Sequence, residues 1–448
     1  MMFNKIKLGE LLNQKKAHSQ TGPFGTQLKA SNYVHSGIPV INVKNIGFGD
    51  IRSEGLEFVT EEFSNVLKQH QLKENDIVFG RKGAVERHAL ISKNEAGWVQ
   101  GSDCIRLRLL TKDYDPKFLS YFFRTEYHKQ WMINLGSFGA TMGSLNQEII
   151  SKIEIPDIPL PIQAKIASIL SAYDELIENN KQRIKLLEEM AEEIYKEWFV
   201  RMRFPGYEST KFYNEEGKEV PHGTKDALPE GWEYIKVRDA FSIQGGGTPK
   251  TEINEYWEEG KINWFSPTDI TGSDSIFLEK SAKQISQLGL AKSSAKIFPK
   301  KSVMMTSRAT IGAVGINITE ACTNQGFITC IPNSNFSYPY IYEWIKSNKI
   351  LMENYSCGAT FKEISRGVFK NLNILKPSTP IMKKFTEVMV CLFDELHILG
   401  AKNELLQQTR DLLLPRLISG KLSVEHLIKE EEEKLSMAAE PVSGYGEK

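Results

Sequence analysis

Polar and basic side chains recur in Gly-containing loops in both halves of this 448-residue chain. Arg and Lys can fork onto guanine edges or neutralise phosphates, and Asn or Gln can pair with adenine. The loops therefore predict contacts to DNA, and the alternative for any single residue is an ordinary solvated loop position. The candidates are Lys29, Lys44, Asn45, Arg81, Lys82, Arg87, His88 and Thr141 in the first half, and Thr248, Lys250, Thr268, Arg308, Thr310, Asn324, Gln325, Thr360 and Lys362 in the second.

Catalytic and cofactor-binding motifs are missing from the sequence. The run 245–250 has a Pro where a phosphate-binding loop needs backbone amides, and its spacing differs from GxxxxGK[ST]. No HExxH, GxSxG or GxGxxG stands in a convincing context, and the Asn-Pro-Pro-aromatic turn of amino-methyltransferases is absent. Glu215 and Glu216 near Lys218 could imitate a nuclease metal site, but they lie in a polar connector. The pattern favours a binding or scaffold role without a metal.

The composition is that of an ordinary globular protein, with 41% hydrophobic and 25% charged residues. No apolar run approaches the ~20 residues of a membrane span, and the N-terminus lacks the apolar core of a signal peptide. The five cysteines are scattered, which argues against structural zinc and disulfides and favours a cytoplasmic protein. A net charge of zero gives no overall attraction to nucleic acid, so basic faces would have to be local.

Two long helices are predicted to position the loops. Apolar residues of the first helix, 161–198, recur in alternating steps of four and three, which is the rhythm of a coiled coil. The second helix, 380–417, shows the same rhythm, and each needs a partner because a single seam is marginal alone. The two seams are Ile166, Leu170, Tyr173, Ile177, Asn180, Ile184, Leu187, Ala191, Ile194 and Trp198, and Phe385, Met389, Leu392, Leu396, Leu399, Asn403, Leu406, Arg410, Leu413 and Leu417.

Asn180 and Asn403 interrupt the apolar seams. A buried Asn at such a position fixes helix register at a cost in stability, so we predict a register role for both residues. The alternative is that each lies at a frayed or partner-facing part of its helix.

An internal repeat spans nearly the whole chain. The tetrapeptide YDEL at 173–176 corresponds to FDEL at 393–396, and SFGAT at 137–141 corresponds to SCGAT at 356–360. NVKNI at 42–46 likewise corresponds to SPTDI at 266–270, and FGRKGAV at 79–85 corresponds to TSRATIGAV at 306–314. Short apolar runs separated by turn residues predict mixed α/β domains before each long helix, with one helix over 116–134.

The fold class predicted is therefore α+β. The segments are a first domain 1–160, a first spacer helix 161–203, a connector 204–229, a second domain 230–378, a second spacer helix 379–422 and a disordered tail 423–448. Trp131, Trp264 and Trp344 are expected in the cores, and His18, His35 and His70 are expected at the surface.

Over residues 1–422 the chain resembles the DNA-specificity subunit of Type I restriction–modification systems. The resemblance rests on the ordered combination of the duplicated α/β units, QGGGTP at 244–249, the two Ser-x-Gly-Ala-Thr loops, LPIQAKIASIL at 160–170, KEWFVRMRFPG at 196–206 and LLLPRLISGKL at 412–422. It implies two target-recognition domains separated by two antiparallel helices, related by a pseudo-two-fold axis. Each domain would contact one half of a bipartite, asymmetric site in double-stranded DNA, and the helices would set the gap.

The resemblance also implies partners. Two modification (methyltransferase) subunits would dock on the outer faces of the helices, and two restriction (translocase/nuclease) subunits would join the full complex. S-adenosylmethionine, ATP and Mg²⁺ would belong to those subunits, with no cofactor in this chain. Two alternatives stay open from the residues: a self-sufficient DNA methyltransferase or nuclease, and a coiled-coil scaffold without a DNA role.

Overall fold

The computed structural model describes residues 3–136, 144–308, 310–356 and 362–439. Contacts divide the chain into two compact units: unit 1 is Met1–Leu176 with Leu406–Lys448, and unit 2 is Ile177–Leu405. Each long helix is therefore divided between the two units. The reason is that each helix packs apolar side chains into the core of both units.

Unit 1 is built around a five-stranded sheet in the order β2-β9-β6-β7-β4. Neighbouring strands are antiparallel except β4 and β7, which are parallel. A three-stranded sheet β5-β3-β8 and the antiparallel pair β1-β10 complete the unit. The strands are β1 (Asn4–Lys7), β2 (Ala17–Thr21), β3 (Ile38–Ile41), β4 (Phe48–Gly49), β5 (Glu57–Val59), β6 (Ile77–Gly80), β7 (His88–Leu90), β8 (Val99–Gln100), β9 (Cys104–Leu109) and β10 (Glu154–Asp157).

Two helices in unit 1 replace the single helix predicted over 116–134. Helix α3 is Pro116–Phe123 and α4 is Glu126–Gly136. The break follows from Thr125, whose hydroxyl donates to the Phe122 carbonyl at 2.6 Å and lies 3.4 Å from the His128 amide, so its side chain starts a new helix as a cap. The other helices are α1 (Leu8–Asn13), α2 (Glu61–Val66) and α5 (Gln147–Ser151).

Unit 2 repeats the strand arrangement of unit 1. Its sheets have the orders β15-β22-β19-β20-β17 and β18-β16-β21, with the antiparallel pair β14-β23, and the parallel pairs fall at the same places. The strands of these sheets are β14 (Glu233–Lys236), β15 (Ser242–Gly245), β16 (Ile262–Phe265), β17 (Phe277–Leu278), β18 (Lys283–Ile285), β19 (Val303–Thr306), β20 (Val314–Asn317), β21 (Ala321–Thr323), β22 (Phe327–Ile331) and β23 (Asn373–Lys376). The helices are α7 (Val237–Ala240), α8 (Pro267–Thr271), α9 (Gln287–Ala291), α10 (Tyr338–Ser347), α11 (Lys349–Asn354) and α12 (Arg366–Lys370).

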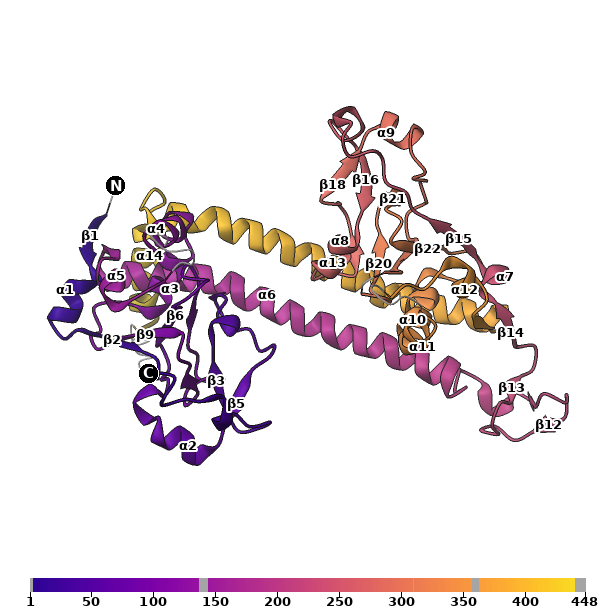
Figure 1. Cartoon of the computed structure of the whole chain (residues 1–448), viewed down its shortest axis with the longest axis horizontal. Coiled ribbons are helices and arrows are strands. Elements are labelled where there is room, and N and C mark those ends of the chain that lie inside the picture. The colour runs from indigo at the N-terminus through magenta and orange to yellow at the C-terminus, as the bar shows by residue number, and fades with distance from the viewer. Residues whose placement is uncertain (1–2, 137–143, 309, 357–361, 440–448) are drawn as a thin grey trace, which may run out of the picture. The chain divides into compact units, whose positions relative to one another are not determined.

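The two predicted long helices are present as α6 (Leu160–Tyr195, 36 residues) and α13 (Thr379–Ile418, 40 residues). A π-helical turn over Lys196–Val200 extends α6. In unit 2 they run antiparallel, since the rings of Trp198 and Phe385 lie 5.6 Å apart and Asn180 contacts Asn403 further along. Figure 1 labels both helices.

The helix seams lie in the cores, as predicted. In unit 1, Ile166 and Leu170 of α6 and Leu417 of α13 join one cluster. In unit 2, Ala191 of α6 and Phe385 of α13 join another. At the end of α6 the fully packed residues are Tyr195 and Phe199, one position beyond the predicted Ile194 and Trp198, which are half-buried. Each buried Phe adds about 1.5–3 kcal/mol of transfer free energy, which a lone helix would lack.

Burial confirms the expectations for Trp264 and Trp344 and contradicts one for histidine. Both indoles are buried, and Trp131 is half-buried against the unit 1 core. His70 is buried, and burial lowers the pKa of its ring, so it is not the surface residue expected. It is the last residue of a 3-10 turn, Lys68–His70, and it is the buried residue of that turn.

Part of the predicted disordered tail is helical. Helix α14 is Glu425–Ala439, whereas residues 440–448 lie outside the described ranges. The charged composition conceals a stripe in which Val424 is buried and Ile428 packs against the unit 1 core. Lys165 of α6 also forms an ion pair with Glu431.

The connector 204–229 is more ordered than its polar composition predicts. Its strands β11 (Phe212–Tyr213), β12 (Glu219–Val220) and β13 (Leu228–Pro229) form a small sheet in the order β12-β11-β13. Phe204 and Phe212 reach the unit 2 core, which explains the ordering. Across the described parts of the chain, no helix combines the length and apolarity needed to cross a bilayer.

Candidate nucleic-acid interface

Backbone hydrogen bonds join several strand ends of unit 1 into one edge. Because β3 and β8 are parallel, their carboxyl ends meet, and the Gly101 amide donates to the Ile41 carbonyl at 2.9 Å. Arg81 directly follows β6, and its amide donates to the Asp103 carbonyl at 2.8 Å. We call these loops, residues 22, 42–45, 81–82 and 101–103, loop edge 1.

Two predicted cations of loop edge 1 are held by exposed carboxylates. The Lys82 ammonium lies 3.4 Å from Asp103, and the Lys44 ammonium lies 3.4 Å from Glu57. Exposed pairs of this kind contribute about 0–1 kcal/mol. Both ammonium groups can therefore exchange their carboxylate for a phosphate or a base acceptor at small cost.

Unit 2 forms the corresponding edge from the same strand ends. Thr248 donates its hydroxyl to Gln325 at 2.6 Å, and the Asn324 side chain accepts the Gly326 amide at 2.8 Å. The Ser307 amide, directly after β19, donates to the Gly326 carbonyl at 2.8 Å. We call these loops, residues 246–250, 266–268, 307–308 and 324–326, loop edge 2. The predicted residues Thr248, Asn324 and Gln325 are thus brought together.

Arg308 and Lys82 occupy matched places in the two edges. Arg308 forms an isolated β-bridge with Glu363, as Lys82 does with Ser144. The Arg308 guanidinium also lies 2.9 Å from the Glu363 carboxylate, and both side chains are exposed. The predicted Lys362 directly precedes Glu363 in the sequence and is exposed. Each edge therefore carries one cation at a matched position, and the backbone of that residue pairs with a later segment of the chain.

Asn45 was predicted to contact DNA, and the structure contradicts this. It is fully buried; its side chain accepts the Asn42 amide at 3.2 Å and donates to the Arg52 carbonyl at 3.1 Å. Asp269 accepts the Ser266 amide at 2.7 Å in the matching turn of unit 2. The NVKNI and SPTDI runs therefore correspond, but their fourth residue holds the turn together from inside.

The DNA contact predicted for His88 is also wrong. Its ring is fully buried, and Nε2 lies 3.0 Å from the Ser120 hydroxyl of α3. Burial, followed by the charges of Arg124 and His128, holds the pKa of His88 well below its usual range. The imidazole is therefore neutral and packed between sheet and helix, away from any DNA surface.

The remaining candidates differ in their surroundings. Lys29, Lys250, Thr268 and Thr310 are exposed. Thr268 belongs to loop edge 2 through its 2.9 Å contact with the Ser266 hydroxyl. Arg87 lies over the Phe48 ring, 5.7 Å from its centre. Thr141 and Thr360 lie outside the described residues.

Sequence reasoning did not single out two sets of residues whose positions or contacts stand out in the structure. Gln147 and Arg366 begin the helices that follow the two Ser-x-Gly-Ala-Thr loops, and their equal distance from those loops was the available signal. In unit 1, Asp174 accepts hydrogen bonds from Tyr121 at 2.7 Å and Arg410 at 2.5 Å. Arg410 was a charged residue in an apolar seam, and that anomaly could have identified the network.

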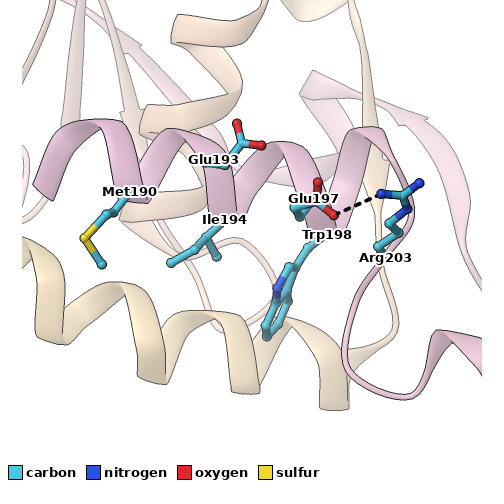
Figure 2. A pocket seen from close by; sticks show the side chains of 6 residues that line it. All are labelled: Met190, Glu193, Ile194, Glu197, Trp198 and Arg203. Carbon is cyan, nitrogen blue, oxygen red and sulfur yellow. Dashed lines mark ion pairs between the residues drawn. The ribbon is translucent and has the colours of Figure 1, made fainter. Parts of the chain in front are cut away.

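A groove of about 410 Å³ lies along the last turns of α6 in unit 2. Figure 2 shows Met190, Ile194 and Trp198 along one side of the helix, with Arg203 and Glu197 paired at 3.9 Å at its end. Met190 is 52% exposed, so the groove presents apolar surface beside charges. Among the residues that the structure describes, no group of His, Cys, Asp and Glu could hold a metal ion.

Comparisons with known proteins agree with this arrangement. The family model described as the Type I restriction modification DNA specificity domain matches residues 3–189 and 229–408. The HindI specificity subunit of Haemophilus influenzae is 24% identical over 441 residues, covering 85% of this chain and 94% of that protein. The MjaIX specificity subunit of Methanocaldococcus jannaschii is 32% identical over 183 residues, covering 40% and 42% of the two chains.

The fold also matches a solved structure. The crystal structure of a Type I restriction–modification S subunit from M. genitalium covers 93% of this chain and 96% of its own, with a TM-score of 0.58 at 16% identity. Because the family model matches both repeats of the chain, the protein belongs to the Type I restriction modification DNA specificity domain family.

Proposed function

We propose that this chain is the DNA sequence-specificity subunit of a Type I restriction–modification complex, with each unit contacting one half of a bipartite site. The observation that carries the proposal is the duplication of one loop edge on one strand topology with different side chains. Matched positions hold Lys82 and Arg308, so the two halves of the site would differ in sequence. An asymmetric target follows.

The chemistry of the loop edges suits base and phosphate contacts. Thr248, Gln325 and Arg308 offer hydroxyl, amide and guanidinium groups, and Lys82 offers an ammonium group. Major-groove edges of bases present the complementary acceptors and donors. Two local cation-bearing edges also explain how a chain of zero net charge can bind DNA.

The long helices serve as spacer and docking surface in this proposal. Helices α6 and α13 run through both units, so their length and register would set the gap between half-sites. Two modification subunits would dock on the outer faces of the helices, and the groove beside Met190 supplies exposed apolar area for one of them. Restriction subunits would join the complex that this chain forms with the modification subunits. S-adenosylmethionine, ATP and Mg²⁺ would bind to those partner subunits.

The test uses the full chain assembled with its modification subunits and labelled S-adenosylmethionine. Lys82→Ala and Arg308→Ala are matched variants, and we expect each to weaken sequence preference in a different half of the methylated site. Loss of preference in the same half for both would contradict the assignment. Methyl transfer or DNA cleavage by the purified chain alone would instead favour the self-sufficient enzyme, and unchanged DNA affinity in both variants would favour the scaffold.

A further inference from the structure

The first residue of a short helix occupies the same place beside both loop edges. Gln147 begins α5, which the Asn146 side chain caps by accepting the Ile149 amide at 2.8 Å. Arg366 begins α12, which Ser365 caps in the same way at 3.2 Å. Matched caps make Gln147 and Arg366 the same position of the repeat.

Backbone hydrogen bonds tie this position to the matched cations. The Leu145 amide donates to the Arg81 carbonyl at 2.7 Å, and the Ile364 amide donates to the Ser307 carbonyl at 3.1 Å. Each helix therefore starts two residues after a bond that joins it to the end of β6 or β19. The first side chain of the helix is held at the loop edge.

The residue opposite this position on the edge strand differs between the units. By strand register, Thr21 pairs with Ile105 and Gly245 pairs with Ile328, which places Thr21 and Gly245 at equivalent points. In unit 1 the Gln147 amide lies 3.4 Å from the Thr21 hydroxyl.

Gly245 makes room for the Arg366 guanidinium in unit 2. A Cβ atom at Gly245 would lie 2.5 Å from Nη1 and 2.8 Å from Cζ of Arg366. The guanidinium therefore rests against the bare backbone of β15, in space that any larger residue would fill. Thr21 with Gln147, and Gly245 with Arg366, are two alternative pairs at one place.

Arg366 has hydrogen-bonding capacity to offer a ligand. It is exposed, and within the described residues its guanidinium forms no ion pair or hydrogen bond, whereas the neighbouring Arg308 is paired with Glu363 at 2.9 Å. A planar guanidinium matches the O6 and N7 acceptors of guanine, and a carboxamide matches N7 and N6 of adenine. Gln147 and Arg366 thus present two different base-recognition chemistries from one scaffold position.

We propose that the position shared by Gln147 and Arg366 determines specificity, with Gln147 contacting an adenine in one half-site and Arg366 a guanine in the other. The inference rests on the proposed function, because it names the bases that the two loop edges select. It adds two residues to the interface and gives a reason for the Gly at 245, where a Cβ atom would meet the guanidinium of Arg366.

The experiment maps methylated sites produced by the full complex carrying Arg366→Ala. We expect discrimination at one guanine of one half-site to fall about 10- to 100-fold, with the other half unchanged. Lys370→Ala, an exposed change at the far end of α12, is the matched control and should leave the site unchanged. Gly245→Ala should mimic Arg366→Ala, since the atoms it displaces are the end of a side chain.

The transplanted pair Gly245→Thr with Arg366→Gln gives the sharper test. We expect it to shift the preferred base at that position from guanine toward adenine. An unchanged site in Arg366→Ala, or a uniform loss of affinity for every sequence, would overturn the inference and identify a solvated or phosphate-binding residue. If the parent complex yields no bipartite methylated site, the proposed function itself fails, and the two failures are thereby distinguished.

Discussion

Asn180 donates a hydrogen bond from Nδ2 to Oδ1 of Asn403 at 2.9 Å, and both side chains are buried in unit 2. One side-chain amide thus pairs with the other across the two seams. The pair cannot slide by one turn without leaving two polar groups unpaired. This excludes a frayed position for either residue, and their role in setting helix register stays a prediction.

The asparagine pair should behave as a coupled unit. Asn180→Leu leaves Asn403 buried without a partner, and we expect the free energy of unfolding to fall by about 1–3 kcal/mol. Replacing both residues with Leu should recover most of that loss. Denaturant titration of the single and double variants measures the coupling; strictly additive losses would show that the hydrogen bond has no energetic role.

Asp174 should stabilise unit 1 through its three partners. Tyr121, Arg124 and Arg410 all contact its carboxylate, at 2.7, 2.8 and 2.5 Å. Burial raises the pKa of Asp174, but the Arg124 charge and the hydrogen bonds outweigh it, so the pKa lies below its usual range. Because the folded pKa is lower than the unfolded pKa, this stabilisation is present at neutral pH and is lost as the pH falls toward the folded pKa.

Asp174→Asn should therefore lower the free energy of unfolding by about 1–3 kcal/mol at pH 7. This loss is smaller than that for a fully buried ion pair, because solvent reaches the arginine partners. Asp394→Asn is the matched control: it changes the same residue of the repeated tetrapeptide, and Asp394 is exposed. Thermal denaturation of both variants decides; equal effects would show that the network around Asp174 contributes nothing.

Glu343 should make unit 2 less stable as the pH rises. Its side chain is 1% exposed, and burial raises its pKa to about 7, with Lys346 and Lys196 opposing and Glu192 and Glu188 reinforcing the shift. The unfolded carboxyl releases its proton near pH 4.5, whereas the folded one keeps it until about pH 7. The penalty therefore grows between these values and is complete above pH 7, on the order of 3 kcal/mol.

Glu343→Gln should remove this pH dependence and raise stability at pH 8. Glu189→Gln, which removes an exposed carboxylate of α6, controls for the lost charge. The measurement is the denaturation midpoint of each variant between pH 5 and pH 8. A midpoint that falls equally for the parent chain and Glu343→Gln would exclude Glu343 as the cause.

Met190→Asp should weaken assembly with the modification subunits. Met190 lines the groove on α6 and is exposed, so a charge there opposes burial of the groove without disturbing a core. We expect at least tenfold weaker association by calorimetry or size-exclusion titration. Leu110→Asp is the control, because Leu110 is an exposed apolar residue directly after β9, whose other end meets loop edge 1.

The sequence predicted those features that depend on local periodicity or on the repeat. The seams of α6 and α13, the place of Asn180 and Asn403 within those seams, and the correspondence of NVKNI with SPTDI all followed from spacing, whereas the contact between the two asparagines appeared only in the structure. His88 and Asn45 were misplaced because their burial depends on contacts made by the tertiary fold. His88 meets Ser120 of α3, and Asn45 meets the carbonyl of Arg52, and neither contact leaves a periodic signal.

Arg366 was missed for a related reason. Its place against Gly245 depends on the hydrogen bond that ties the start of α12 to the end of β19 and on the register of β15 with β22, which the sequence alone does not specify. Helix α14 was missed because the glutamates of 430–433 outweigh the apolar stripe around Val424 in any compositional average. The charged composition therefore predicted disorder in a segment where a few buried apolar contacts stabilise a helix.

The exchange of a recognition domain tests the central claim most directly. Residues 1–157, which end with β10 before α6 begins, would be replaced by the corresponding segment of another family member, and the methylated sites of the host genome would be sequenced. We predict that one half of the bipartite site changes while the other half and the gap stay the same. A change in both halves, or in neither, would contradict the account in which each unit contacts its own half-site.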